Sequence, residues 1–221
     1  MVVSLHNLSA RVASLSDLRA VTELMTACDL AESGIADPEQ KDVWKAWHAS
    51  GFNLKTDAWI VVTNDGLLVG YADVRCNEHG QWTFLLRVHP DYQARGIGVL
   101  LIWLVEKRMR QLITHACPKV MLSSVISSMD RATSHLLERD GYTLVRSFWR
   151  LAIEMDEVPF DEIDHGSELI VIDSQNLVGM TPLQKRTGMY VARQYRVYEK
   201  ELRVMEEIHI TEDVEAQPLM I

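Results

Sequence analysis

Residues 88–101 read VHPDYQARGIGVLL, and this stretch decides the fold of the chain. An apolar run from Trp82 to Val88 leads into it, and a pattern of helical spacing from Gly98 to Ile113 follows it. We therefore expect a strand, a tight loop and the first turn of a helix. Such a turn presents backbone N–H groups at the positive end of a helix dipole, which favours the binding of anions, and of phosphates above all. Gly96 and Gly98 allow a ligand to approach the backbone where a side chain would block it.

The same stretch resembles the pyrophosphate loop of the GNAT family of N-acetyltransferases. In that family the loop reads Gln/Arg-x-x-Gly-x-Gly/Ala, which residues 93–98, QARGIG, match. A strand end of the form V-x-P-x-Y precedes the family's loop, as VHPDY does at 88–92. The family's second signature is a helix that carries Asn, Ala and Leu-Tyr and ends in Gly-Phe. Residues 130–142, DRATSHLLERDGY, are similar to it, with Asp130 at the Asn position.

The order of predicted elements agrees with this resemblance from Leu8 to Met155. It indicates an α/β (α+β) fold, in which a mixed central β-sheet is flanked by helices on both faces. The predicted strands cover residues 8–13, 58–63, 67–76, 81–88, 120–127, 142–147 and 149–155, and the predicted helices cover 18–31, a segment starting at Pro38, 98–113 and 131–139.

A C-terminal extension follows the predicted GNAT domain, which we expect to span residues 1–158. Residues 156–221 hold fourteen acidic and six basic residues, so nearly all of the net charge of −9 lies there. A short strand is expected at 169–173. Apolar residues then recur every three or four positions, which predicts one long helix from about 183 to 208 within the extension 159–221. Its apolar stripe has three alternative uses: packing on the parent domain, a homodimer contact, or a site for a partner protein. The stripe consists of Val191, Tyr195, Tyr198, Leu202 and Met205.

Composition disfavours several classes of protein. The chain is 48% hydrophobic and 24% charged, which is ordinary for a globular domain. We expect no membrane segment and no signal peptide, and hence a cytoplasmic protein. No basic patch stands out, which disfavours nucleic-acid binding. The three cysteines form no CxxC pair, so we expect neither a disulfide framework nor a metal site.

The resemblance implies acetyl-CoA as cosubstrate and direct acetyl transfer to a primary amine, of a small molecule or a protein, in a ternary complex. In the family, the strand before the loop carries a bulge and splays from the next strand, so that the pantetheine arm pairs with exposed backbone. The loop amides hold the pyrophosphate. By this resemblance the cofactor-binding residues are Leu86, Arg87, Val88, Gln93, Ala94, Arg95, Gly96, Ile97, Gly98, Val99 and Asp130.

The groups that move protons are not determined by the sequence. The family's frequent tyrosine, which is thought to protonate the leaving thiolate, falls on Leu137, and leucine cannot do this. Tyr142, Ser128 or water could replace it. A non-catalytic acyl-CoA-binding module is therefore the alternative to an acetyltransferase. The candidate catalytic residues are Glu78, His79, Ser124 and Tyr142, with a water relay as a further alternative.

Overall fold

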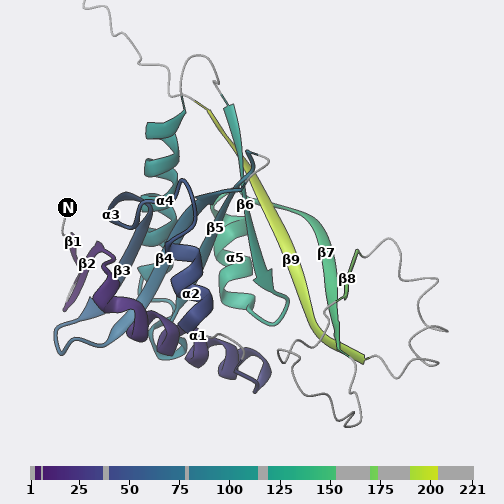
Figure 1. Cartoon of the computed structure of the whole chain (residues 1–221), viewed down its shortest axis with the longest axis horizontal. Helices are drawn as coiled ribbons and strands as arrows, with labels where there is room; N and C mark the ends of the chain where they lie inside the picture. The colour runs from purple at the N-terminus through teal and green to yellow at the C-terminus, as the bar shows by residue number, and fades with distance from the viewer. Residues whose placement is uncertain are drawn as a thin grey trace, which may run out of the picture.

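In the part of the chain that the structure describes, nine strands form one sheet in the order β1-β2-β3-β4-β5-β6-β9-β7-β8 (Figure 1). Among these strands only β5 and β6 pair in parallel. The computed structural model describes residues 3–5, 7–36, 40–77, 80–113, 119–152, 170–173 and 190–203. The strands are β1 Val3–Leu5, β2 Leu8–Val12, β3 Ala58–Thr63, β4 Leu68–Cys76, β5 Trp82–Val88, β6 Lys119–Ser127, β7 Thr143–Ala152, β8 Ile170–Asp173 and β9 Tyr190–Arg203.

Helices cover both faces of the sheet, as the sequence predicts. Helices α1 (Leu18–Ser33) and α2 (Gln40–Trp47) cover one face of the sheet, and α4 (Ile97–Leu112) and α5 (Arg131–Arg139) cover the other (Figure 1). The side chains of each pair form a separate buried cluster with the sheet. Phe84 and Leu86 of β5 belong to the α4 cluster, whereas Leu85 packs with the α1 cluster. This alternation is the two-residue period of a strand that is covered on both sides. Helix α3 spans Leu54–Asp57, and short 3₁₀ turns lie at Leu15–Asp17 and Pro90–Tyr92. None of these helices is long and apolar enough to cross a membrane.

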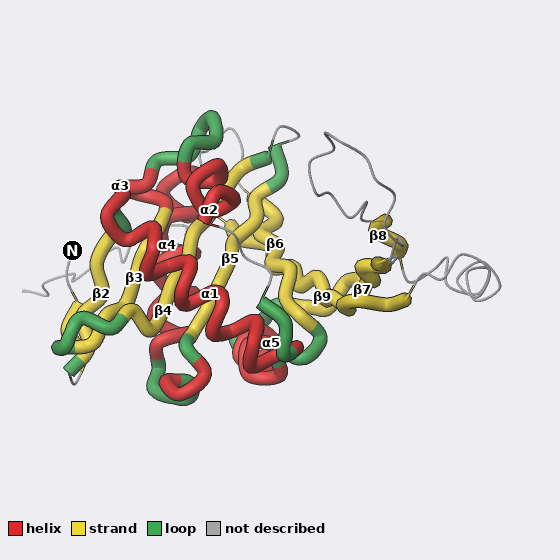
Figure 2. Tube along the Cα trace, turned by 60° about the horizontal axis from the view of Figure 1, so that its bottom comes forward, coloured by secondary structure: helices red, strands yellow, loops and turns green. Residues whose placement is uncertain are grey.

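The predicted C-terminal helix is wrong wherever the structure describes it, because Tyr190–Arg203 forms strand β9. This strand lies between β6 and β7 and is antiparallel to both (Figure 2). Tyr198 and Leu202, two members of the predicted helical stripe, are buried in the sheet core. Residues 183–189 and 204–208 of the predicted helix lie outside the described residues.

The physical reason for this error is that strand pairing is non-local. The segment is rich in tyrosine and valine, which fit a pleated surface. Tyr198 pairs with Ser124 of β6 on one side and with Leu144 of β7 on the other. The spacing of apolar residues within the segment contains no information about either partner strand. Residues 190–203 therefore offer no helix through which a homodimer could form. Strands from both sides of position 158 belong to one sheet.

The predictions for β7 and β8 have opposite outcomes. The two predicted strands at 142–147 and 149–155 are one strand, Thr143–Ala152, in the described residues. Its register against β9 shifts at two points, between Leu144 and Arg146 and between Arg150 and Leu151. These irregularities allow one continuous strand to cover the region in which the sequence predicts two. The short strand predicted at 169–173 is confirmed as β8.

Candidate active site

The predicted phosphate loop joins β5 to α4. Gly96 precedes the helix with a φ of 80°, and Ala94 has a φ of 60°. The left-handed conformation is unfavourable for alanine and occurs at functional turns, where it directs successive N–H groups to one side. The amides of Ile97, Gly98 and Val99 lie in the first turn of α4, where a helix offers them no acceptor. The loop therefore presents several backbone N–H groups at the positive end of the α4 dipole.

Gly98 of α4 lies close to Leu136 of α5. A Cβ atom on Gly98 would lie 2.5 Å from Cδ2 of Leu136, so the Leu136 side chain would have to shift if Gly98 were replaced. A cavity of about 510 Å³ lies between the loop and α5, and we call it the loop cavity. Seven of the predicted cofactor-binding residues line it: Val88, Gln93, Ala94, Gly96, Ile97, Gly98 and Val99. Tyr92 and five residues of α5, namely Ala132, Thr133, His135, Leu136 and Arg139, complete the lining.

Strands β5 and β6 separate next to this loop. They pair only from Trp82–Leu122 to Phe84–Ser124, although β5 continues to Val88 and β6 continues to Ser127. The splay expected from the resemblance is therefore present. The expected bulge is not, because all seven pairs of β4 with β5 keep one register. At the last parallel pair, the Ser124 hydroxyl donates a hydrogen bond to the Phe84 carbonyl at 3.1 Å.

A second cavity of about 270 Å³ lies beside the separated strands, and we call it the inner cavity. Val88, Gln93 and Ala132 line both cavities, so the two adjoin. The remaining lining comes from three separate parts of the chain: Cys28, Ala31 and Glu32 of α1, Arg87 and Pro90 around the end of β5, and Met129, Asp130 and Arg131 before α5. The two cavities together thus extend from the loop at 93–98 toward α1.

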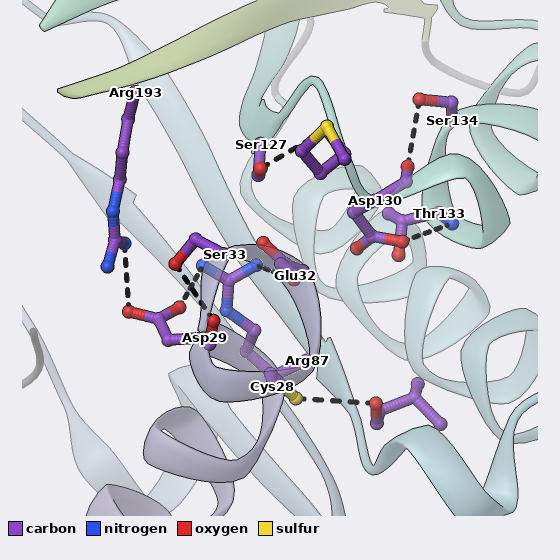
Figure 3. Close-up of polar contacts among 12 residues, drawn as sticks. Cys28, Asp29, Glu32, Ser33, Arg87, Ser127, Asp130, Thr133, Ser134 and Arg193 are labelled. Atoms are coloured by element: carbon purple, nitrogen blue, oxygen red, sulfur yellow. Dashed lines mark hydrogen bonds and ion pairs between the residues drawn. The ribbon is translucent and has the colours of Figure 1, made fainter. Parts of the chain in front are cut away.

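Charged side chains from three elements meet beside the inner cavity. Figure 3 shows Arg87 between two carboxylates of α1. Its Nη2 lies 3.6 Å from Asp29 Oδ1, and its Nη1 lies 3.5 Å from Glu32 Oε1. Arg193 of β9 also contacts Asp29, at 3.0 Å, and donates to the Ile35 carbonyl at 2.7 Å. The C-terminal strand therefore holds the end of α1 in place.

Burial changes the acidity of two α1 side chains in this region. The Cys28 thiol donates to the Val88 carbonyl at 3.4 Å, and burial raises its pKa to about 12. The thiol is therefore protonated at neutral pH and unreactive. Burial also raises the pKa of the Glu32 carboxyl, although the positive charge of Arg87 opposes this change. The sequence analysis missed Glu32 and Arg193, because an acidic residue at a helix end and an arginine in a C-terminal segment carry no signal until the chain is folded.

Asp130 has the capping role that its place before α5 suggests. Its Oδ1 accepts a hydrogen bond from the Thr133 amide at 2.9 Å. The side chain also lines the inner cavity. Nearby, the Ser127 hydroxyl accepts a hydrogen bond from the Met129 amide at 3.2 Å. The turn between β6 and α5 is thus fixed by side chains at the edge of the cavity.

Other predicted residues lie elsewhere. Leu86 is buried in the core and Arg95 stacks on Tyr92 at 4.6 Å beside a separate surface cavity, so neither side chain lines the loop cavity or the inner cavity. Ser124 is fully buried. Tyr142 is buried against Phe84 and donates to Glu106 at 3.2 Å.

Neither Ser124 nor Tyr142 lines the loop cavity or the inner cavity. Glu78 and His79 lie outside the described residues. Leu137, at the family's tyrosine position, is fully buried in the core. Within the described ranges, no group of three or more His, Cys, Asp or Glu residues could hold a metal ion.

The sequence of the chain is similar to those of known acetyltransferases. The family model described as "Acetyltransferase (GNAT) family" matches residues 18–142. An acetyltransferase of Photorhabdus laumondii is 31% identical over 132 residues, which cover 60% of this chain and 84% of that protein. An acetyltransferase of Sodalis glossinidius is 34% identical over 112 residues, which cover 51% of this chain and 72% of that protein.

Solved structures share the fold. A GCN5-related N-acetyltransferase from Sphaerobacter thermophilus superimposes with a TM-score of 0.74 at 20% identity, over 91% of this chain and 98% of that one. A phosphinothricin acetyltransferase of the GNAT superfamily from Sinorhizobium meliloti, solved in complex with AcCoA, gives a TM-score of 0.55 at 16% identity, over 89% of each chain. Together with the match to the family model over more than half of its length, these relatives show that the chain belongs to the GNAT family and is an acyltransferase.

Proposed function

We propose that this protein transfers an acetyl group from acetyl-CoA directly to a primary amine, of a small molecule or a protein, in a ternary complex. The observation that carries the proposal is the junction of the two cavities at Val88 and Gln93, where β5 and β6 separate. One cavity offers backbone amides to an anion, and the other offers space and ionisable side chains. A long phosphorylated thioester and a second substrate could thus meet at one point.

The chain's groups fit acetyl-CoA in two respects. The left-handed residues Ala94 and Gly96 and the first turn of α4 suit a pyrophosphate, which needs several N–H donors and a positive potential. Beyond Phe84, one edge of β5 has no partner strand in the described sheet. An arm that contains amide groups could pair with this edge as an added strand would. The Sinorhizobium meliloti relative, which was solved with AcCoA, supports this assignment by its shared fold.

Direct transfer is favoured by the state of Cys28, the only thiol among the described residues that line the inner cavity. A covalent route needs an activated nucleophile, usually a thiolate or a hydroxyl beside a base. Cys28 instead keeps its proton and donates it to the Val88 carbonyl. The protein's contribution is then to hold both substrates in line, which lowers the entropic part of the barrier.

The test is thiol release from acetyl-CoA by the purified full-length chain. A panel of polyamines, amino acids, arylalkylamines and short peptides supplies the amine, and mass spectrometry identifies the acetylated product. We expect amine-dependent release with sequential kinetics and no acetylated protein in the intact mass. Saturable acetyl-CoA binding without release on any amine would instead establish a non-catalytic binding module. A Cys28-acetylated protein that forms and decays in step with turnover would contradict direct transfer.

A further inference from the structure

The inner cavity contains one carboxylate that no backbone group engages in the described structure. Glu32, in the last turn of α1, is 13% exposed and lines the cavity together with Val88 and Gln93. The other carboxylate in the lining, Asp130, accepts the Thr133 amide as a helix cap. Glu32 therefore lies where the two cavities adjoin and is not committed to a structural hydrogen bond of this kind.

The contact between Glu32 and Arg87 is loose. The closest approach, 3.5 Å between Oε1 and Nη1, is an ion pair without a hydrogen bond. The buried Nη1 atom of Arg87 has no hydrogen-bond partner among the described residues. Asp29, in contrast, is held at 3.0 Å by Arg193. Of the two α1 carboxylates beside Arg87, Glu32 is thus the more loosely held, with the Ser127 hydroxyl as its other polar neighbour.

The surroundings of Glu32 suit a proton acceptor. Burial raises the pKa of its carboxyl, and the negative charges of Asp130 and Asp29 act in the same direction, while Arg87 and the Ser127 hydroxyl oppose them. A base is most effective when its pKa lies near the working pH, so a raised value brings a carboxylate closer to that condition. The charged and titratable groups around it come from α1 (Cys28, Asp29), β5 (Arg87) and the turn before α5 (Asp130, Arg131), with Arg193 of β9 behind Asp29 and the neutral Ser127 hydroxyl of β6 as a hydrogen-bond partner.

We propose that Glu32 is the general base that deprotonates the acceptor amine, a role that rests on the acetyl transfer proposed above. The ammonium group gives one proton to the Glu32 carboxylate, and the neutral nitrogen forms a bond to the acetyl carbonyl carbon. The C–S bond breaks, and its electron pair leaves with sulfur. The second nitrogen proton reaches that sulfur through water, which yields the amide and free CoA thiol. Glu32 then returns its proton to solvent.

The test compares Glu32→Gln with Glu23→Gln in the full-length protein. Glu23 is on the same helix, but its side chain is 62% exposed and pairs with Arg19 at the surface. With the best amine of the panel, we expect Glu32→Gln to lower kcat about 100-fold or more, which is the usual contribution of general-base catalysis. The KM for acetyl-CoA and its calorimetric Kd should stay unchanged, and Glu23→Gln should behave as wild type.

The pH profile separates this role from a structural one. Wild-type kcat/KM should fall as the pH drops through the raised pKa of Glu32, because the protonated carboxyl cannot accept a proton. Glu32→Gln should lose this acidic limb, and Glu32→Asp should restore part of both rate and limb. An unchanged kcat and an unchanged limb in Glu32→Gln would overturn the role of Glu32 while the acetyltransferase stands. A wild type that releases no thiol with any amine would overturn the proposed function, and the role of Glu32 with it.

Discussion

The loop cavity and the inner cavity adjoin, yet they are built in different ways. Most of the loop cavity comes from one continuous segment, Val88 to Val99, and its expected work is done by backbone amides. The inner cavity is assembled from α1, the end of β5 and the turn before α5, and its functional groups are side chains. The loop cavity, which we call the backbone site, is thus encoded by one local segment. The inner cavity, which we call the side-chain site, depends on tertiary packing. Three experiments test whether the two cavities differ in this way.

The largest effect is expected at Gly98, in the backbone site. Gly98→Asp would place a carboxylate in the first turn of α4, and its Cβ would contact Leu136. We expect the Kd for acetyl-CoA to rise about 1,000-fold, which corresponds to about 4 kcal/mol. Calorimetric titration measures this change.

A matched Gly98→Asn variant isolates the charge, because it adds nearly the same volume without it. We expect Gly98→Asn to bind acetyl-CoA more tightly than Gly98→Asp, by a margin that shrinks as salt is added. Equal affinities of the two variants at low salt would show that bulk alone blocks the site. The loop would then not be an anion cradle.

An intermediate effect is expected at Arg193, which links β9 to the side-chain site. Arg193→Ala would leave Asp29 buried with only the longer 3.6 Å contact to Arg87. Breaking such a buried pair should lower the free energy of unfolding by about 3 kcal/mol. It should also raise the KM for the amine more than the Kd for acetyl-CoA, since α1 borders the inner cavity. Chemical denaturation and steady-state kinetics measure the two quantities.

The control for this experiment is Arg203→Ala on the same strand. The Arg203 side chain is 77% exposed and pairs with Glu201, so we expect a change of about 0.5 kcal/mol or less. A comparable rise in the Kd for acetyl-CoA and in the amine KM of Arg193→Ala would be evidence against separate cavities. The two sites would then respond as one unit.

The smallest effect is expected from a pair of neighbours in α5. Leu137 is fully buried, so Leu137→Tyr would overpack the core and cost about 2 kcal/mol of stability. Leu136 is only partly buried and lines the loop cavity. Leu136→Tyr should leave stability nearly unchanged and raise the Kd for acetyl-CoA about tenfold. Thermal melts and calorimetry, run on both variants, measure this.

The opposite result would place position 137, instead of position 136, beside the substrates. If Leu137→Tyr changed thiol release without loss of stability, position 137 would have access to the substrates, as the family's tyrosine does. Because Leu137 is buried, we expect Leu137→Tyr to lower stability and not to reach the substrates. This burial also means that a tyrosine at this position could not be added to the present core without displacing its neighbours.

Much of the fold could be predicted because its elements carry local signals. The loop at 93–98 combines glycines at a strand-to-helix boundary with a matching string, and the structure confirms a strand, a loop and a helix in this order. Asp130 precedes a helical pattern and caps α5. The segment Tyr190–Arg203 failed because its spacing allows a helix, while its pairing with β6 and β7 decides for a strand. The candidates Ser124 and Tyr142 failed to reach the cavities for a similar reason, since burial depends on the whole sheet.

The order of residues along the chain was enough to predict the glycine loop between β5 and α4, the family resemblance and the mixed sheet with helices on both faces. These features follow from residue type and short-range order, because glycine conformation, helix starts and strand alternation depend on neighbours in the chain. Only the tertiary structure decided that the tail supplies a central strand, that Arg193 holds Asp29, and that Glu32 lies in the inner cavity beside Arg87. Arg193 and Asp29 are 164 residues apart, and such contacts form only when packing pays the entropy of bringing distant segments together.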